Sequence, residues 1–293
     1  MKLLASWVLG ISLVSLAAVD AATYEEQILE WRAGRIERLT APTGWLSLVG
    51  LHWIKPGLNS IGNGPGVDID LGRGPDKLGE LRWEGERLYF RPNGEVVTVN
   101  GQSVLGTDLI PDYKGTPTVV EFGTAQFYVV KRGERLGLRV KDSESPVRTQ
   151  FAGIDYFPID QKWQVEARWE AHEPDRTIEI ATILGDLEQI PNPGRAVFTI
   201  DGQEYSLEAL EEEGEEQLFF IVFDATSGKQ TYGSGRFFYA DRPVDGRLTL
   251  DFGKAYNPPC AFTEFSTCQL PPAENRLRLA IEAGEKKYAG AKH

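Results

Sequence analysis

Short runs in which apolar and polar residues alternate fill the chain from Trp45 onward, and this period of two limits the fold more than any other feature. Runs such as "GELRWEG" (79–85) and "RLGLRVKD" (135–142) are bounded by Gly, Pro, Asn or Asp, at intervals of about ten residues. In "VNGQ", Asn100 and Gly101 both tolerate positive φ, which favours a type I′ hairpin turn. Strands this short and this regularly spaced predict a mainly β fold, an antiparallel sandwich or open barrel.

A crossover at Ser145-Pro146 breaks this alternation, which then resumes in runs such as "QLFFIVFD" and "GRFFYA". The break divides the chain into a first β-rich half, residues 45–145, and a second, residues 146–293. No long linker separates the two, and no internal repeat is evident. We therefore expect two β-rich halves that pack together.

One segment, "TYEEQILEWRAGRIERLTA", has the period of a helix instead. Thr23 and Glu26 form a capping box at its start, and Pro42 ends it. Its apolar residues fall on one broad stripe: Tyr24, Ile28, Leu29, Trp31, Ile36 and Leu39. Residues 22–44 are therefore predicted to form an N-terminal helix that packs on the body of the protein.

The run "GLNSIGNGPGVDIDL" (57–71) faintly resembles the start of a forkhead-associated domain. That family binds phosphothreonine through an Arg and a Ser-x-x-His motif. Here "KLGEL" (77–81) stands where that motif should fall. The resemblance therefore concerns the fold of the first half, and phosphopeptide binding is not carried over.

Residues 1–21 have the pattern of a Sec-type signal peptide. Lys2 precedes an apolar stretch, and Val19 and Ala21 occupy the small-residue positions of a cleavage site. The alternative is an N-terminal membrane anchor, for which the apolar stretch is only marginally long. Cleavage after Ala21 predicts an exported protein, periplasmic or secreted, with no integral membrane segment in its mature form.

The balance of charge excludes two classes of partner. The chain has 31 basic and 43 acidic residues, a net charge of -12. Nucleic acids and anionic membrane surfaces both need a basic face, so neither is an expected partner. Part of the acidic excess lies in "EALEEEGEEQ" (208–217), a run typical of a solvated loop or helix face.

Cys260 and Cys268 are the chain's two cysteines, and both lie in a proline-rich stretch. An oxidising compartment would favour a disulfide between them. Two buried free thiols, or a metal or catalytic site, are the alternatives. A zinc site wants four ligands, and apart from the C-terminal residue only His52 and His172 could add imidazoles. We therefore predict no metal and no cofactor.

Three long motifs identify a family. They are "TSGKQTYGSGRFFY", "LDFGKAYNPPCAFTEFSTCQLPPAENRL" and "AGEKKY". They resemble the domain of unknown function 1684 family of bacteria and archaea, over most of the mature chain. The resemblance implies no activity, because the family is uncharacterised. Members of that family without an export signal also carry the cysteine pair. Because a reducing compartment does not favour disulfides, the resemblance weakens the case for a disulfide here.

The Pro/Cys loop, residues 255–276, is a candidate wall of a ligand site. Its two Pro-Pro pairs fix φ and stiffen the loop before anything binds. Polar residues in and near the loop suit a carboxylate, a phosphate or sugar hydroxyls: Thr231, Tyr232, Arg236, Tyr256, Asn257, Asn275 and Arg276. The alternative is structural: Arg236 or Arg276 would pair with Asp224 or Asp251 inside the fold, and Asn257 would cap a turn.

Catalytic signatures are absent from the sequence. There is no G-x-S-x-G elbow, H-E-x-x-H helix or Walker loop. His52 has apolar neighbours, which is typical of a core histidine. His172 is predicted to lie in an exposed turn. Asp224 and Asp251 could still act as an acid/base pair. The sequence thus leaves three hypotheses: a protein that binds a small polar or saccharide ligand, a hydrolase, or a purely structural protein.

Overall fold

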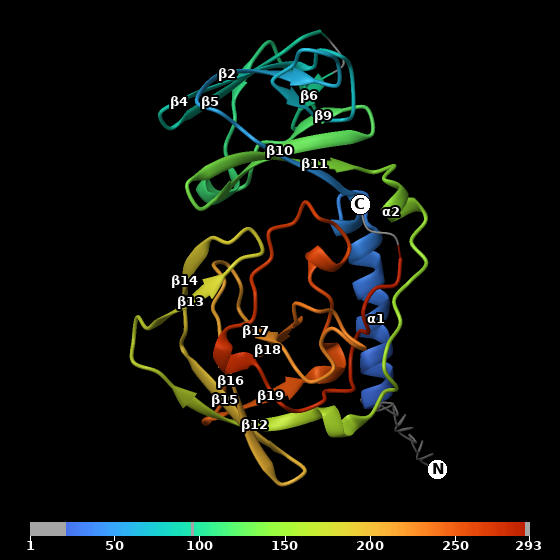
Figure 1. The fold of residues 1–293 in the computed structure, drawn as a ribbon, viewed down its shortest axis with the longest axis vertical. Coiled ribbons are helices and arrows are strands. Elements are labelled where there is room, and N and C mark those ends of the chain that lie inside the picture. The colour runs from blue at the N-terminus through green and yellow to red at the C-terminus, as the bar shows by residue number, and fades with distance from the viewer. Residues whose placement is uncertain (1–21, 95–96, 291–293) are drawn as a thin grey trace, which may run out of the picture.

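The chain folds into two β-rich lobes with one long helix beside them (Figure 1). The computed structural model describes residues 22–94 and 97–290. The predicted fold class is confirmed, since the structure is mainly antiparallel β with one N-terminal helix. The predicted signal peptide, residues 1–21, lies outside the described residues. Among the helices of the described part, none is both long and apolar enough to cross a membrane.

Two sheets make up the first lobe. One has the strand order β1-β11-β10-β9-β6-β7 and the other β3-β2-β4-β5-β8. The strands are β1 (Leu48–Trp53), β2 (Gly57–Gly62), β3 (Ile69–Asp70), β4 (Gly79–Glu84), β5 (Arg87–Pro92), β6 (Val97–Val99), β7 (Gln102–Ser103), β8 (Thr107–Asp108), β9 (Val120–Phe122), β10 (Ala125–Arg132) and β11 (Arg135–Asp142). Asn100 and Gly101 join β6 to β7 with φ of 49° and 76°, which confirms the predicted turn. Phe90 and Phe127 meet edge to face between the sheets, with ring centroids 5.6 Å apart.

Strand β11 has two chemically different faces. Leu136, Leu138 and Val140 point into the core of the first lobe. Arg139 and Lys141 alternate with them and therefore lie on the opposite face. In Figure 1, β10 and β11 are the strands of the upper lobe nearest the lower lobe. The polar face of β11 thus lies at the junction between the lobes.

The second lobe contains a four-stranded sheet, β16-β15-β12-β19, and the hairpins β13-β14 and β17-β18. Its strands are β12 (Gln164–Ala171), β13 (Thr177–Ala181), β14 (Leu187–Pro191), β15 (Gly194–Ile200), β16 (Gln203–Ala209), β17 (Leu218–Val222), β18 (Arg236–Ala240) and β19 (Arg247–Asp251). The β17-β18 pair separates two environments. Phe220 and Phe238 stack in the main core at 5.1 Å, while Phe219, Phe237 and Tyr239 cluster on the other face.

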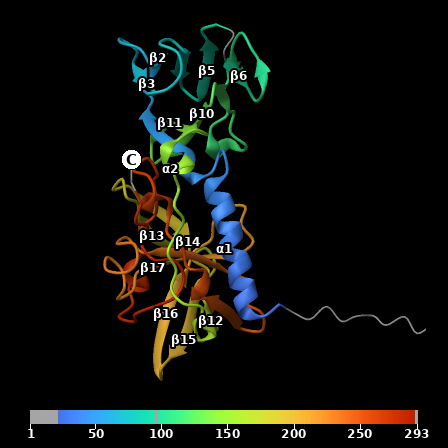
Figure 2. The same ribbon diagram turned by 90° about the vertical axis from the view of Figure 1, so that its right-hand side faces the viewer.

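Helix α1 (Tyr24–Thr40) runs along the second lobe (Figure 2). The predicted capping box between Thr23 and Glu26 is confirmed. The predicted apolar stripe is only partly buried: Leu29 is 50% exposed, whereas Arg35 is 7% exposed. Arg35 is buried because its Nε donates to Glu285 Oε1 at 3.0 Å and its Nη2 to the Asn257 carbonyl at 2.9 Å. The helix is therefore anchored by an ion pair as well as by apolar packing.

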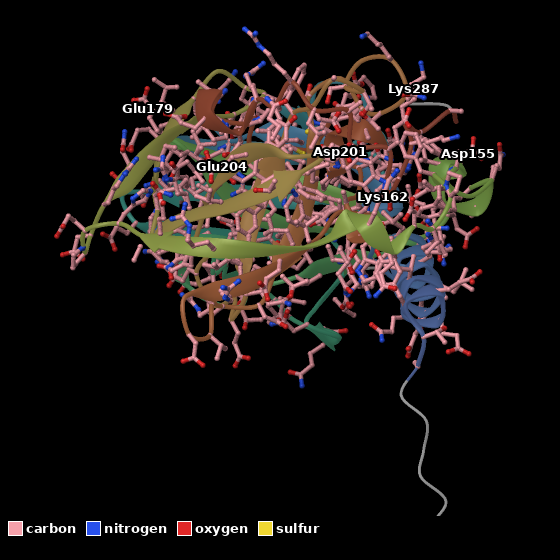
Figure 3. The ribbon with its side chains drawn as sticks, turned by 90° about the horizontal axis from the view of Figure 1, so that it is seen from below. Asp155, Lys162, Glu179, Asp201, Glu204 and Lys287 are labelled. Atoms are coloured by element: carbon pink, nitrogen blue, oxygen red, sulfur yellow. The ribbon has the colours of Figure 1, made fainter. Side chains whose placement is uncertain are left out.

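The lobes are joined by a short helix, α2 (Pro146–Thr149), and by side-chain contacts across the junction. Arg132 Nε donates to Thr267 Oγ1 at 2.8 Å, and Thr263 Oγ1 donates to the Leu48 carbonyl at 3.2 Å. The two lobes therefore pack directly on each other. Seen from below the second lobe, charged side chains such as Lys162 and Glu204 lie on its outer surface (Figure 3).

The chain after β19 forms short 3₁₀ turns in place of strands or long helices. The turns are η4 (Phe252–Lys254), η5 (Pro259–Ala261) and η6 (Ala273–Asn275). Backbone groups of such a segment need partners from elsewhere when they are buried. Arg236 supplies some of them, since its guanidinium donates to the carbonyls of Ile281 (2.9 Å) and Ala283. The C-terminal segment is thus held in place by a buried cation.

Candidate functional site

A cavity of about 1040 Å³ lies between α1, the β17-β18 hairpin, the Pro/Cys loop and the base of the first lobe. We call it the main cavity. Six aromatic side chains line it: Trp31, Trp45, Phe219, Phe237, Tyr239 and Tyr256. Charged groups line it as well, among them Arg35, Arg38, Lys141, Glu212, Asp251 and Lys254. Both flat apolar faces and polar groups are therefore available to a bound molecule.

A row of polar groups runs along one wall of the main cavity. The Tyr239 hydroxyl donates to Glu212 Oε2 at 2.6 Å, and the Tyr256 hydroxyl is in hydrogen-bond contact with Tyr239. The Tyr256 ring packs edge to face on Phe237 and lies 4.5 Å from the Arg35 guanidinium carbon. Cation–π contact and ring packing fix the orientation of Tyr256.

Burial changes the ionisation of this row. Burial raises the pKa of the Glu212 carboxyl, and the hydrogen bond from Tyr239 offsets part of this effect. Burial also raises the pKa of the Tyr239 and Tyr256 hydroxyls, so both remain neutral donors at ordinary pH. Glu212 is thus a carboxyl group that can hold a proton at higher pH than an exposed glutamate does.

A second cavity, of about 360 Å³, adjoins the first, and we call it the side cavity. The two share Trp45, Glu212, Phe219, Phe237 and Pro259 as lining residues, so they lie side by side, and together we call them the cleft. The first lobe contributes Lys131, Arg132 and Arg139 to the side cavity, and the Pro/Cys loop contributes residues 266–269. The Pro/Cys loop therefore borders both parts of the cleft.

Several residues predicted for the site lie inside the fold instead. Arg236 is 1% exposed and its Nη2 is 2.8 Å from Asp224 Oδ2. Asp224 also accepts from the backbone N–H of Ile281 at 3.0 Å and from the Thr226 hydroxyl, which bonds in turn to Thr231 at 2.8 Å. The ion pair that the structural alternative describes is therefore present between Arg236 and Asp224. The reason is strand parity: Arg236 shares the inner face of β18 with Phe238.

The other polar residues of the predicted cluster are spread over separate contacts. Asn257 Nδ2 donates to Glu285 Oε2 at 2.9 Å, and Asn275 Nδ2 donates to the Glu208 carbonyl at 3.0 Å. Both asparagines are fully buried. Arg276 lies on the surface over the Phe223 ring, and the Tyr232 hydroxyl donates to the Cys260 carbonyl at 3.1 Å. None of these four lines the main or the side cavity.

Tyr256 and Asp251 are the predicted site residues that line the main cavity. Asp251 accepts from the Tyr24 hydroxyl at 2.9 Å and lies 3.3 Å from Lys254 Nζ. Tyr239 and Glu212 also line the main cavity, although neither was predicted as a site residue from the sequence. Alternation along "GRFFYA" could have placed Tyr239 opposite Arg236, but nothing distinguishes Glu212 from the glutamates around it.

The two cysteines are free thiols that face each other across the turn. The backbone N–H of Cys260 donates to Cys268 Sγ at 3.2 Å, and that of Cys268 to Cys260 Sγ at 3.3 Å. A hydrogen bond from the Cys268 thiol lowers the pKa of Cys260, with help from the Ser266 hydroxyl and the charge of Arg139. The Cys260 thiolate and burial raise the pKa of Cys268. The described residues contain no group of three or more His, Cys, Asp or Glu arranged to hold a metal ion.

Comparison with known proteins places the chain in a family. The model for the "Protein of unknown function (DUF1684)" family matches residues 149–286, the part that holds the β17-β18 wall and the Pro/Cys loop. The chain belongs to this family, as its motifs predict.

Solved structures and curated proteins add little about activity. A solution NMR structure of an uncharacterized protein from gene locus rrnAC0354 of Haloarcula marismortui is 31% identical, covering 47% of this chain and 78% of that chain, with a TM-score of 0.40. Two FHA-domain structures are each 19% identical over 31% of this chain, with a TM-score of 0.22. One comes from work on phosphothreonine-dependent FHA interactions, with 92% of that chain covered; the other is the FhaA FHA domain complexed with the intracellular domain of Rv3910, with 97% covered. None of the curated proteins matches this chain.

The buried Arg236–Asp224 pair predicts a large loss of stability when one partner is removed. Arg236→Ala should lower the free energy of unfolding by roughly 3–5 kcal/mol, because Asp224 is left charged and buried. The matched control is Arg82→Ala, which breaks the exposed Arg82–Glu84 pair and should cost at most about 1 kcal/mol. Urea denaturation of both variants measures the difference, and equal losses would contradict the structural role of Arg236.

The thiol geometry predicts unequal reactivity. At neutral pH, iodoacetamide should label Cys260 before Cys268. The lowered pKa of Cys260 increases its thiolate fraction, whereas the raised pKa of Cys268 decreases the thiolate fraction of that residue. Peptide mass spectrometry over a pH series identifies which sulfur is labelled. A chain that takes label only after reduction would show that the predicted disulfide has formed, and equal labelling would contradict the pKa difference.

Proposed function

We propose that this is an exported protein that binds a small polar or saccharide ligand in the cleft beside the Pro/Cys loop. The main cavity is the observation that carries the proposal. Its size is near that of ligand pockets, about 300–1,000 Å³, which typically combine apolar walls with a few oriented polar groups. The aromatic lining and the Glu212–Tyr239–Tyr256 row supply both.

Saccharides suit this lining in particular. A sugar ring has an apolar face that can lie on Trp31 or Trp45, and hydroxyls that can donate to Glu212 or accept from a tyrosine. The proline-rich loop that borders the cleft is preorganised, which reduces the entropy lost on binding. Export is supported by the pattern of residues 1–21 alone.

Trp31 provides a direct test of the ligand site. Trp31→Ala should weaken binding of a cleft ligand by about tenfold or more, since an aromatic contact of about 1.5 kcal/mol is lost together with its buried area. The ligand would be found by a thermal-shift screen of the mature chain against mono- and disaccharides and polar metabolites. Titration calorimetry then compares the variants.

Trp83→Ala is the matched control, because Trp83 packs on the first lobe and lines neither cavity. It should leave the affinity unchanged. A ligand whose affinity is the same in the parent and in Trp31→Ala would not be bound in the main cavity, and the proposal would then fail.

A hydrolase is the second candidate, favoured by the presence of Glu212 and Asp251 in the same cavity. Asp224 is committed to Arg236, so the acid/base pair proposed here is Glu212 with Asp251. A carboxyl group whose pKa is raised by burial suits a general acid, and a second carboxylate can act as base or nucleophile. A glycosidic bond lying between them would be the natural substrate.

Glu212→Gln separates the two candidates. It keeps the size of the side chain and a hydrogen-bond acceptor for Tyr239 but removes the proton that a general acid must give. In a hydrolase, we expect a loss of turnover of about 10²–10⁴-fold with little change in ligand affinity. Release of product from aryl glycosides measures turnover. Turnover that survives in Glu212→Gln would exclude this mechanism.

A further inference from the structure

The face of β11 at the lobe junction carries two cations without a carboxylate partner. Arg139 is 5% exposed, and its Nε has no hydrogen-bond partner. One of its terminal nitrogens, Nη2, is 3.4 Å from Thr267 Oγ1. Lys141, two residues on, donates to the Thr43 carbonyl. Among the described residues, neither cation forms an ion pair with an Asp or Glu. Burying a charge in this way is costly unless something compensates it.

Both cations face the ligand cleft. Arg139 lines the side cavity and Lys141 lines the main cavity. Trp45 lies between the two cavities and bridges the cations, with its ring 5.4 Å from the Arg139 guanidinium carbon and 5.7 Å from Lys141 Nζ. Burial and the charge of Arg139 lower the pKa of Lys141 to about 8, as expected for two like charges held close together.

The two glutamates of the side cavity already accept hydrogen bonds from other residues. Glu188 accepts from Gln269 Nε2 at 3.0 Å, and Glu212 accepts from the Tyr239 hydroxyl. Of the other cations of the side cavity, Arg132 is paired with Asp112. Arg139 and Lys141 thus lie at one end of the cleft as cations that have no carboxylate partner among the described residues.

We propose that Arg139 and Lys141 bind an anionic group, a carboxylate or a phosphate, on the ligand of the cleft. The planar guanidinium of Arg139 can donate to an anion in the side cavity, and the Lys141 ammonium can approach it from the main cavity. This inference rests on the proposed ligand cleft and specifies its ligand class: an acidic sugar or another small organic anion in place of a neutral one.

Inorganic phosphate is the first probe. Sodium phosphate should raise the melting temperature of the mature chain by about 2 °C or more over sodium chloride at equal ionic strength. Arg139→Met should abolish this shift, and in chloride it should be no less stable than the parent, since a buried unpaired cation is removed. Lys141→Gln should reduce the shift and serves as a second variant. Arg135→Gln, an exposed position on the same face of β11, is the charge-matched control and should keep it.

Paired ligands then distinguish the source of the anion. Glucose, glucuronate and glucose 6-phosphate share a ring and differ in charge, so the tighter-binding acid identifies carboxylate or phosphate. Arg139→Met should lower the affinity for that acid at least about tenfold and leave the affinity for glucose unchanged. The anion site would be overturned if phosphate does not raise the melting temperature of the parent, or if the rise persists in Arg139→Met. In the first case, the charge of Arg139 would serve to stabilise the Cys260 thiolate.

The outcomes separate this inference from the proposed function. Neutral sugars that bind in a Trp31-dependent way without any phosphate shift would leave the ligand cleft standing and remove the anion site. A phosphate shift that depends on Arg139, with no sugar bound, would leave an anion site and remove the saccharide proposal.

Discussion

The buried ion pair between Arg236 and Asp224 is the contact on which the shape of the second lobe depends. Its members lie on one face of the β17-β18 hairpin and reach the C-terminal segment, where regular strands are absent. Arg236 binds the carbonyls of Ile281 and Ala283, and Asp224 accepts the N–H of Ile281. Two side chains thus replace the hydrogen bonds that a neighbouring strand would otherwise provide.

This arrangement extends to the cleft through Glu285. Its backbone lies next to the carbonyls bound by Arg236, and its buried carboxylate receives Arg35 of α1 together with the backbone and side-chain amides of Asn257. Arg35 then lies against the Tyr256 ring. The helix, the C-terminal segment and the start of the Pro/Cys loop are therefore fixed by one connected set of charges. The walls of the cleft are positioned from within the protein.

Local pattern was sufficient to predict most of the strands and the N-terminal helix. Alternation in runs such as "RLGLRVKD" predicts β11, and Thr23 with Glu26 predicts the start of α1. The site was harder to predict because it depends on which polar face meets another part of the chain. Arg139 and Lys141 occupy the polar face of β11, where solvent would be the usual neighbour; only the packing of the second lobe buries them.

Parity explains the largest difference between the predicted and observed site. Arg236, beside the aromatic run "FFY", was predicted to face a ligand, yet the odd-even register of β18 turns it inward and turns Tyr239 outward. The register of a strand relative to the core is a long-range property, set by packing on β17 and β19. Polar composition alone could therefore locate the hairpin at the site but not choose between its two faces.

The cleft is assembled from two parts of the chain that differ in chemistry. The family model matches residues 149–286, which supply Tyr239, Tyr256 and the Pro/Cys loop, while Trp45 and the cations of β11 come from outside that region. A chain with only the matched region would therefore keep the phenylalanines and tyrosines of the cleft and lose its two tryptophans together with the cations of β11. Exchanging the N-terminal part of the chain would then change the charge and the tryptophan surface that the cleft offers, while the β17-β18 wall stays the same.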